Sequence, residues 1–126
     1  MEHPIVVKIM KEGINSVNIS MLDKEAQKRI LSDAGEKLCK ENRFKEAIEA
    51  MTRAGEIEKL LGLGDEFMKQ GRSELAALCI IPTKDKQKLN SVAVLCIQSR
   101  NYSLAAAAYD ASENRQMADF IRKNFC

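Results

Sequence analysis

The chain repeats itself every 29 residues over most of its length. Residues 34–62, 63–91 and 92–120 align with one another without a gap. A period of roughly 20–50 residues is typical of stacked supersecondary units, in which each unit buries its apolar face against the next one. The repeat therefore limits the fold to one small unit that is built several times along the chain.

Equivalent positions of the three copies carry the residue types of two closely packed helices. One position is always alanine (Ala47, Ala76 and Ala105), whose short side chain lets two helices approach closely. Other positions are small at Gly35, Gly64 and Ala93, and apolar at Leu38, Phe67 and Cys96, at Met51, Ile80 and Tyr109, and at Leu60 and Leu89. A polar break separates the two apolar groups of each copy, which indicates a helix, a short turn and a second helix.

These patterns predict the bounds of six helices. The first helices of the hairpins are expected near residues 26–41, 57–70 and 86–99, and the second helices near 44–54, 73–81 and 102–111. We therefore predict an all-α fold, a right-handed α-solenoid of antiparallel helical hairpins with a 29-residue period. The whole chain, 1–126, is interpreted as a single helical-repeat domain with three hairpin repeats in residues 26–112.

The two ends of the repeat are less regular. We interpret residues 1–25 as a degenerate N-terminal capping hairpin, with a helix over 5–12 that Gly13 ends. Residues 14–20 are poor helix formers that alternate enough to be extended, and Ser20 with Asp23 suggests a helix starting at Met21. Residues 113–126 are interpreted as a C-terminal capping helix, with Phe125 and Cys126 at the positions of Leu38 and Cys39. Met1 and the degenerate first copy favour a complete small protein, the alternative being a piece of a longer solenoid.

The run LCKENRFKEAIEAMTRA, residues 38–54, resembles helical-hairpin repeats of the tetratricopeptide-like kind. A closer likeness is to the short α-solenoid repeats of vesicle-coat subunits, the clathrin heavy chain and intraflagellar-transport subunits. The shared features are an aromatic residue just after the turn (Phe44, Tyr102) and an alanine three residues later. The resemblance covers roughly residues 26–126, and it implies a protein-binding scaffold without catalysis.

The residues needed for catalysis are missing from the pattern. The single histidine, His3, lies near the N-terminus, and no Ser or Cys has a plausible base partner. Gly62-Leu-Gly64 is only a fragment of a nucleotide-binding motif, and it follows no strand. We therefore predict that the chain is not an enzyme, binds no cofactor and holds no metal.

The cysteines and the charge bear on compartment and partners. None of the four cysteines has the short spacing of a zinc or redox motif, and Cys39, Cys79 and Cys96 occupy apolar helical positions, as buried free thiols of a reducing compartment do. We therefore expect a cytoplasmic protein, with no apolar run long enough to insert into a membrane. The net charge of +2 does not indicate a nucleic-acid binder, which normally carries a basic stripe.

One exposed feature suggests a binding surface. Arg43, Arg72 and Arg100 fall at the three predicted turns, and Lys40 and Lys45 lie beside the first of them. Equivalent turns line one edge of a solenoid, so these residues would form a basic ridge for an acidic segment or a phosphate. The alternative is that arginine simply keeps each turn soluble.

The predicted function is that of a non-catalytic protein–protein interaction module, which binds a peptide or helix of a partner and belongs to a larger trafficking-type assembly. The binding surface would be this ridge or a groove lined by the first helices. A nucleic-acid-binding helical repeat protein is one alternative, although no repeated polar code is present for it. Self-association through the C-terminal helix is another.

Overall fold

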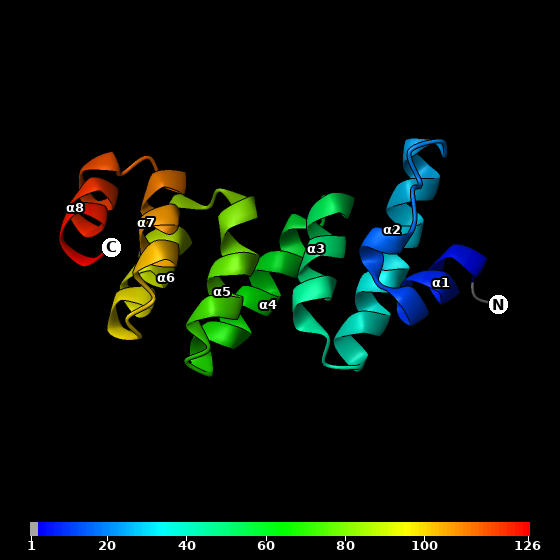
Figure 1. Ribbon diagram of the computed structural model, residues 1–126, viewed down its shortest axis with the longest axis horizontal. Coiled ribbons are helices and arrows are strands. Elements are labelled where there is room, and N and C mark those ends of the chain that lie inside the picture. The colour runs from blue at the N-terminus through cyan, green and yellow to red at the C-terminus, as the bar shows by residue number, and fades with distance from the viewer. Residues whose placement is uncertain (1–2) are drawn as a thin grey trace. The chain divides into compact units, whose positions relative to one another are not determined.

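The computed structural model describes residues 3–126, and this part of the chain is all-helical, with eight α-helices and no strand. The prediction of an all-α fold is therefore confirmed. The chain divides into two compact units, Met1–Ile57 and Glu58–Cys126. In Figure 1 the first unit runs from blue to teal and the second from green to red.

The first unit has three α-helices and one short 3₁₀ turn. Helix α1 spans Pro4–Glu12, the 3₁₀ turn η1 spans Ile14–Ser16, α2 spans Lys24–Lys40 and α3 spans Phe44–Ala54. Helices α2 and α3 form a hairpin, and α1 packs against α2. As expected, Gly13 ends α1, with its N–H donating to the carbonyl of Ile9 and a positive φ of 99°.

A single apolar cluster holds the first unit together. It joins buried residues of α1, η1, α2 and α3, which are Val6, Ile9, Ile14, Ile30, Leu31, Ala34, Leu38, Ala47, Ala50 and Ala54. Val17, Ile19 and Leu22 pack against this cluster from the segment between η1 and α2. In the predicted degenerate hairpin, the place of the second helix is thus taken by a segment that packs its apolar residues on the core but is not helical between residues 17 and 23.

Helix α2 begins later than the expected start at Met21. The carboxylate of Asp23 accepts a hydrogen bond from the N–H of Ala26 at 2.8 Å, so Asp23 is the N-cap and Lys24 is the first helical residue. The N–H of Ser20 instead donates to the side chain of Asn18, which holds Ser20 in a local turn. Met21 is 93% exposed. The capping role assigned to Ser20 is therefore wrong.

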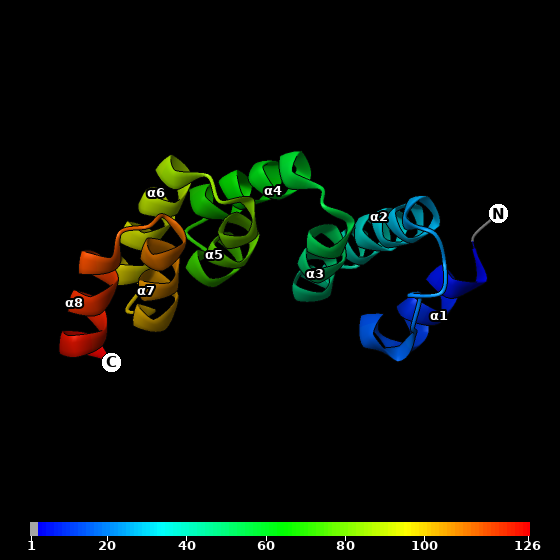
Figure 2. The same cartoon turned by 90° about the horizontal axis from the view of Figure 1, so that it is seen from above.

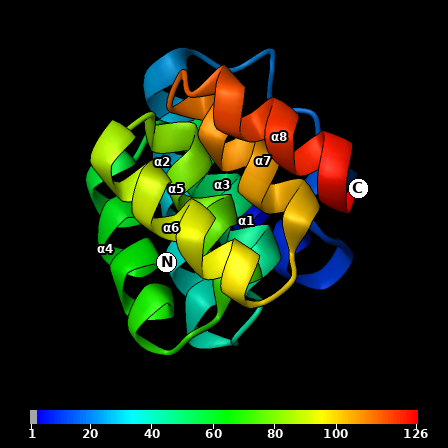
Figure 3. The same ribbon diagram turned by 90° about the vertical axis from the view of Figure 1, so that its left-hand side faces the viewer.

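The second unit contains five α-helices. They are α4 (Ile57–Lys69), α5 (Ser73–Ile80), α6 (Lys86–Gln98), α7 (Tyr102–Ala111) and α8 (Arg115–Phe125), with the 3₁₀ turn η2 (Ile81–Thr83) after α5. Figures 2 and 3 show α4 and α6 on one side of this unit and α5 and α7 on the other. Helix α7 lies between α6 and α8. All six helices expected in the repeat region are present, with ends within two residues of the predicted ones.

The shared small and apolar positions of the sequence are buried in both units. The three alanines Ala47, Ala76 and Ala105 are each 0% exposed. Gly64 gives the closest approach, because a Cβ built there would lie 2.5 Å from Cδ1 of Ile80 and 3.2 Å from Cβ of Cys79. Helices α4 and α5 are therefore as close as glycine allows at this point.

The turns inside the hairpins share one backbone conformation. Asn42, Gly71 and Arg100 all have φ values near +60° to +71°. The next N–H in each turn reaches back to the preceding helix, from Arg43 to the carbonyl of Leu38 and from Arg72 to that of Phe67, at 2.9 Å in both cases. Asn101 bonds to Cys96 in the same way at 2.7 Å. This pattern is the Schellman motif, which ends a helix and satisfies its last carbonyl groups.

The C-terminal helix departs from the expected pattern at Phe125. Its predicted equivalents Leu38 and Phe67 are buried, but Phe125 is 50% exposed. Phe120 on the same helix is 54% exposed. Phe125 stacks on Tyr102, with ring centroids 4.7 Å apart, and Phe120 meets it edge-on at 6.3 Å. None of the described helices is both long and apolar enough to cross a membrane.

Candidate partner-binding site

Arg43 is engaged within the first unit and is not the exposed arginine that the sequence suggested. Its guanidinium donates to the backbone carbonyl of Met10 at 2.7 Å and to the carboxylates of Glu41 and Glu46 at 3.3 and 3.0 Å. Its side chain is 28% exposed. Desolvation works to lower the pKa of Arg43, but the bonds to Glu46 and Glu41 outweigh it and the pKa is raised. Arg43 therefore fastens the end of α1 to the α2–α3 turn.

Replacing Arg43 by methionine is expected to lower the free energy of unfolding, because the carbonyl of Met10 in the last turn of α1 loses a charged donor. Arg43→Lys should recover only part of the loss, since one ammonium cannot serve three acceptors in fixed directions. Urea unfolding followed by circular dichroism measures the change. Arg100→Met is the matched control, and an equal loss in both variants would contradict the fastening role of Arg43.

Arg72 and Arg100 lie at two turns of the second unit, and both are exposed. Figure 1 shows these turns, α4–α5 and α6–α7, at the same end of that unit. The guanidinium carbon of Arg72 lies 5.3 Å from the centroid of the Phe67 ring, a cation–π contact that orients the side chain. Arg100 itself adopts the left-handed conformation, with φ of 61°. Arg43 and Arg72 are thus equivalent in the repeat and Arg100 lies one residue earlier, and the three arginines also differ in their surroundings.

Lys40 lines a pocket between α1 and α2, together with two further lysines that the sequence did not single out. The pocket has a volume of about 410 Å³ and is lined by Val7, Met10, Lys11, Lys37, Lys40 and Glu41. We call it the basic pocket. Glu41 pairs with Arg43, whereas Lys37 is 3.7 Å from Asp33. Lys45, the remaining candidate, is exposed on the first turn of α3 and does not line this pocket.

The basic pocket combines a positive rim with an apolar floor. Val7 and Met10 are half-buried and supply the floor, while Lys11 and Lys40 are exposed. Both lysines lie in the last turn of their helices, where carbonyl groups are negative and a cation is stabilised. A ligand that carries both a carboxylate and an apolar group would match this pocket.

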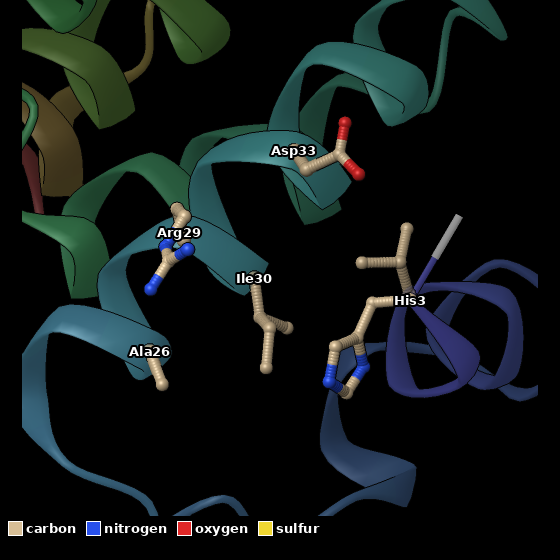
Figure 4. A pocket seen from close by; sticks show the side chains of 6 residues that line it. His3, Ala26, Arg29, Ile30 and Asp33 are labelled. Atoms are coloured by element: carbon tan, nitrogen blue, oxygen red, sulfur yellow. The ribbon is translucent and has the colours of Figure 1, made fainter. Parts of the chain in front are cut away.

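A second hollow lies between the N-terminal parts of the same two helices. It has a volume of about 460 Å³ and is lined by His3, Val6, Ala26, Arg29, Ile30 and Asp33. Figure 4 shows the imidazole of His3 facing Ile30, with Arg29 directed away from His3. Nδ1 of His3 accepts a hydrogen bond from the N–H of Ile5 at 3.1 Å and caps α1. The polar groups of this hollow therefore do not converge on one point.

The four thiols differ in their exposure. Cys79 and Cys96 are buried, as expected, whereas Cys39 is half-buried and Cys126 is exposed. Burial raises the pKa of Cys96 to about 11, and its thiol donates to the carbonyl of Ser73 at 3.7 Å. In residues 3–126 no group of three or more His, Cys, Asp or Glu side chains could hold a metal ion.

Sequence reasoning missed Lys11 and Lys37. The spacing of three residues places Lys37 and Lys40 on one side of α2, and this could be predicted from the sequence. The packing of α1 beside these two lysines could not be predicted. His3 meets the N-terminal half of α2 and Met10 meets its C-terminal half, so the two helices run in the same direction. The basic pocket therefore lies between α1 and α2.

Comparison of the chain with protein-family models, with curated proteins and with solved structures found no match.

Proposed function

We propose that this chain is a non-catalytic protein-binding module of the cytoplasm that binds an acidic, partly apolar segment of a partner protein at the basic pocket. The observation that carries the proposal is the arrangement of Lys11, Lys37 and Lys40 around the floor formed by Val7 and Met10. Lysine rims of this kind attract carboxylates over several ångströms, and an apolar floor holds an aliphatic or aromatic side chain.

The proposal includes the finer architecture, a right-handed α-solenoid with a 29-residue period. Two series of backbone positions support it. Both series have positive φ, and within each series successive residues are 29 positions apart. The first series is Asn42, Gly71 and Arg100, and the second is Gly55, Lys84 and Glu113. The first series lies within the hairpins and the second between them. A recurring backbone conformation is what stacked copies of one unit require.

The resemblance to the short repeats of vesicle-coat, clathrin heavy chain and intraflagellar-transport subunits extends the proposal to a place in a larger assembly. In such an assembly the module would present a preformed surface, so that binding costs little ordering of its own backbone. Nucleic acid is the alternative ligand for a lysine-rimmed pocket. Its binding would weaken steeply with added salt and would not depend on an apolar group in the ligand.

The test uses an array of amphipathic peptides that carry zero to four glutamates beside one leucine or phenylalanine. We expect retention of the folded protein to rise with the number of glutamates. The double variant Lys11→Glu/Lys40→Glu should bind the best peptide about tenfold more weakly or worse, because attraction becomes repulsion. Fluorescence anisotropy with the labelled peptide measures the affinity.

The matched control is Lys24→Glu/Lys28→Glu, which makes the same charge change on exposed residues of α2 outside the pocket. It should bind like the wild type. Equal weakening in both double variants would mean that overall charge, and not the pocket, governs binding. Tighter binding of a single-stranded oligonucleotide than of any peptide would favour the nucleic-acid alternative.

Self-association through α8 is a second candidate, because Phe120 and Phe125 are 54% and 50% exposed on this helix. Sedimentation equilibrium over a range of protein concentrations tests it. A constant monomer mass would reject this candidate and leave the peptide-binding proposal unaffected.

A further inference from the structure

The segment between η1 and α2 contains two peptide groups without a partner in the protein. Within the described residues, no group accepts from the N–H of Asn18 or of Ile19, and none donates to the carbonyls of Val17 or Asn18. Val17 is extended, with φ of −121° and ψ of 144°. Val17 and Ile19 are half-buried while Asn18 and Ser20 are exposed, the alternation of a strand with one covered face.

A hollow of about 430 Å³ lies along this segment. Its lining residues come from the segment, from α2 and from α3, and they are Asn15, Val17, Asn18, Ile19, Ser20, Gln27, Leu31 and Arg53. Val17 and Ile19 are half-buried and supply its apolar surface, whereas Leu31 is only 5% exposed and belongs to the core cluster of the first unit. We call this hollow the strand groove. It shares no lining residue with the basic pocket.

Three side-chain carboxamides around the strand groove each make one hydrogen bond within the protein, through either the oxygen or the nitrogen. The side-chain oxygen of Asn15 accepts from Arg53 at 2.7 Å, and that of Asn18 accepts from the N–H of Ser20 at 3.0 Å. The amide nitrogen of Gln27 donates to the carbonyl of Leu22 at 2.7 Å. The nitrogens of Asn15 and Asn18 and the oxygen of Gln27 remain available. Donors and acceptors are thus both present, as a peptide backbone requires.

The strand groove carries little net charge. Its one cation, Arg53, pairs with Glu49 at 2.7 Å as well as with Asn15. A ligand bound here would therefore gain little from charge, in contrast to one bound in the basic pocket. The matching ligand is an uncharged extended peptide, whose own N–H and C=O groups pair with those of Asn18.

We propose that the strand groove binds an extended, uncharged peptide segment by β-strand addition at Asn18, with a small aliphatic side chain of the peptide against the exposed parts of Val17 and Ile19. Asn18 presents its N–H and C=O on one edge, so it can exchange both hydrogen bonds with one residue of an antiparallel partner. The carboxamides of Asn15, Asn18 and Gln27 hold the peptide groups on either side. This site is additional to the acidic-segment site and does not depend on it.

The probe is a blocked heptapeptide of alternating threonine and valine, titrated into the ¹⁵N-labelled protein and followed by NMR. We expect saturable shifts of the Asn18 amide signal, slower exchange of this amide proton with solvent, and an affinity that changes little with salt. The same peptide with N-methylated valines should not bind, because it lacks the N–H groups that pair with the carbonyls of the segment.

The double variant Asn15→Asp/Asn18→Asp keeps both internal acceptors but replaces the two available donors by negative oxygens. It should bind the probe about tenfold more weakly, since two hydrogen bonds are lost. The matched control is Asn90→Asp/Asn114→Asp, because the side-chain oxygens of these two residues also accept hydrogen bonds within the protein. It should bind like the wild type.

Three results would overturn the proposal. They are the absence of saturable binding up to ~1 mM peptide, unchanged affinity in Asn15→Asp/Asn18→Asp, and shifts centred on the lysines of the basic pocket. The Lys11→Glu/Lys40→Glu variant separates the two sites. It should bind this probe normally even though it fails to bind acidic peptides.

Discussion

Replacing Gly64 by alanine is expected to lower the free energy of unfolding by about 1–2 kcal/mol, although alanine is the better helix former. The added methyl group would lie 2.5 Å from Cδ1 and 2.9 Å from Cγ1 of Ile80, well inside van der Waals contact. Ile80 is fully buried, so its side chain would have to take another rotamer inside a packed core. Urea unfolding of the variant and the wild type gives the difference.

The control lies two residues earlier in the same helix. A Cβ at Gly62 meets nothing within 4 Å, and this residue is exposed. Gly62→Ala should therefore raise the free energy of unfolding by about 0.5–1 kcal/mol, through helix propensity alone. If both variants moved stability in the same direction, the close approach of α4 and α5 at Gly64 would be refuted.

Raising the pH from 9 to 11 is expected to destabilise the protein through Cys96. Burial raises the pKa of Cys96 from 9.0 to about 11 in the folded state. Below pH 9 the thiol is protonated in both states, so the full stability is present. Between pH 9 and 11 the unfolded chain loses the proton while the folded chain keeps it, so stability falls as pH rises, by about 2–3 kcal/mol in all.

Other groups also titrate in this range, so the measurement is a comparison of slopes. The free energy of unfolding is determined at several pH values for the wild type, for Cys96→Ala and for Cys126→Ser. Cys96→Ala should have a lower stability at pH 7, from a small cavity, and a shallower decline above pH 9. Cys126 is exposed, so Cys126→Ser should decline like the wild type. Parallel curves for all three proteins would contradict the burial argument.

The helices of the repeat region could be predicted from the sequence because their signals are local. Apolar residues at helical spacing and a polar turn after Leu38 or Phe67 define a hairpin without knowledge of the rest of the fold. In the structure the same positions are buried, and Gly64 lies in close contact with Ile80 and Cys79 of the next helix. Small residues in a repeated column are informative because packing between two helices selects them directly.

The segment from Ile14 to Asp23 could be predicted only in part. Its extended character was visible in the alternation of apolar and polar residues, but its 3₁₀ turn and the capping role of Asp23 were not. Ser20 and Asp23 are both good N-cap residues, and the choice between them depends on where the chain leaves the core. That choice is made by the packing of Ile19 and Leu22 on the cluster of the first unit.

The candidate sites were harder to predict than the fold, because they depend on which helices come together. Lys40 was selected from its position beside a turn, and it does line a pocket. Lys11 lies 29 residues before Lys40, yet only the parallel packing of α1 on α2 brings the two lysines to one pocket. Arg43 resembled Arg72 and Arg100 in the sequence, and its bond to the carbonyl of Met10 became visible only in the structure. Contacts of this kind have no local sequence signal.

The left-handed turns leave the protein room for stabilisation away from its pockets. Lys84, Arg100 and Glu113 adopt positive φ although they are not glycines. Each is exposed and lines none of the three hollows. Glycine at Lys84 or Arg100 relieves backbone strain at some cost in chain entropy, with a net gain of up to about 1 kcal/mol each. Glu113 also pairs with Lys86 at 2.8 Å, a contact that glycine would remove. A more stable version of the chain could thus be made by redesigning its turns alone. Such a variant would suit crystallisation or serve as a carrier for grafted peptides.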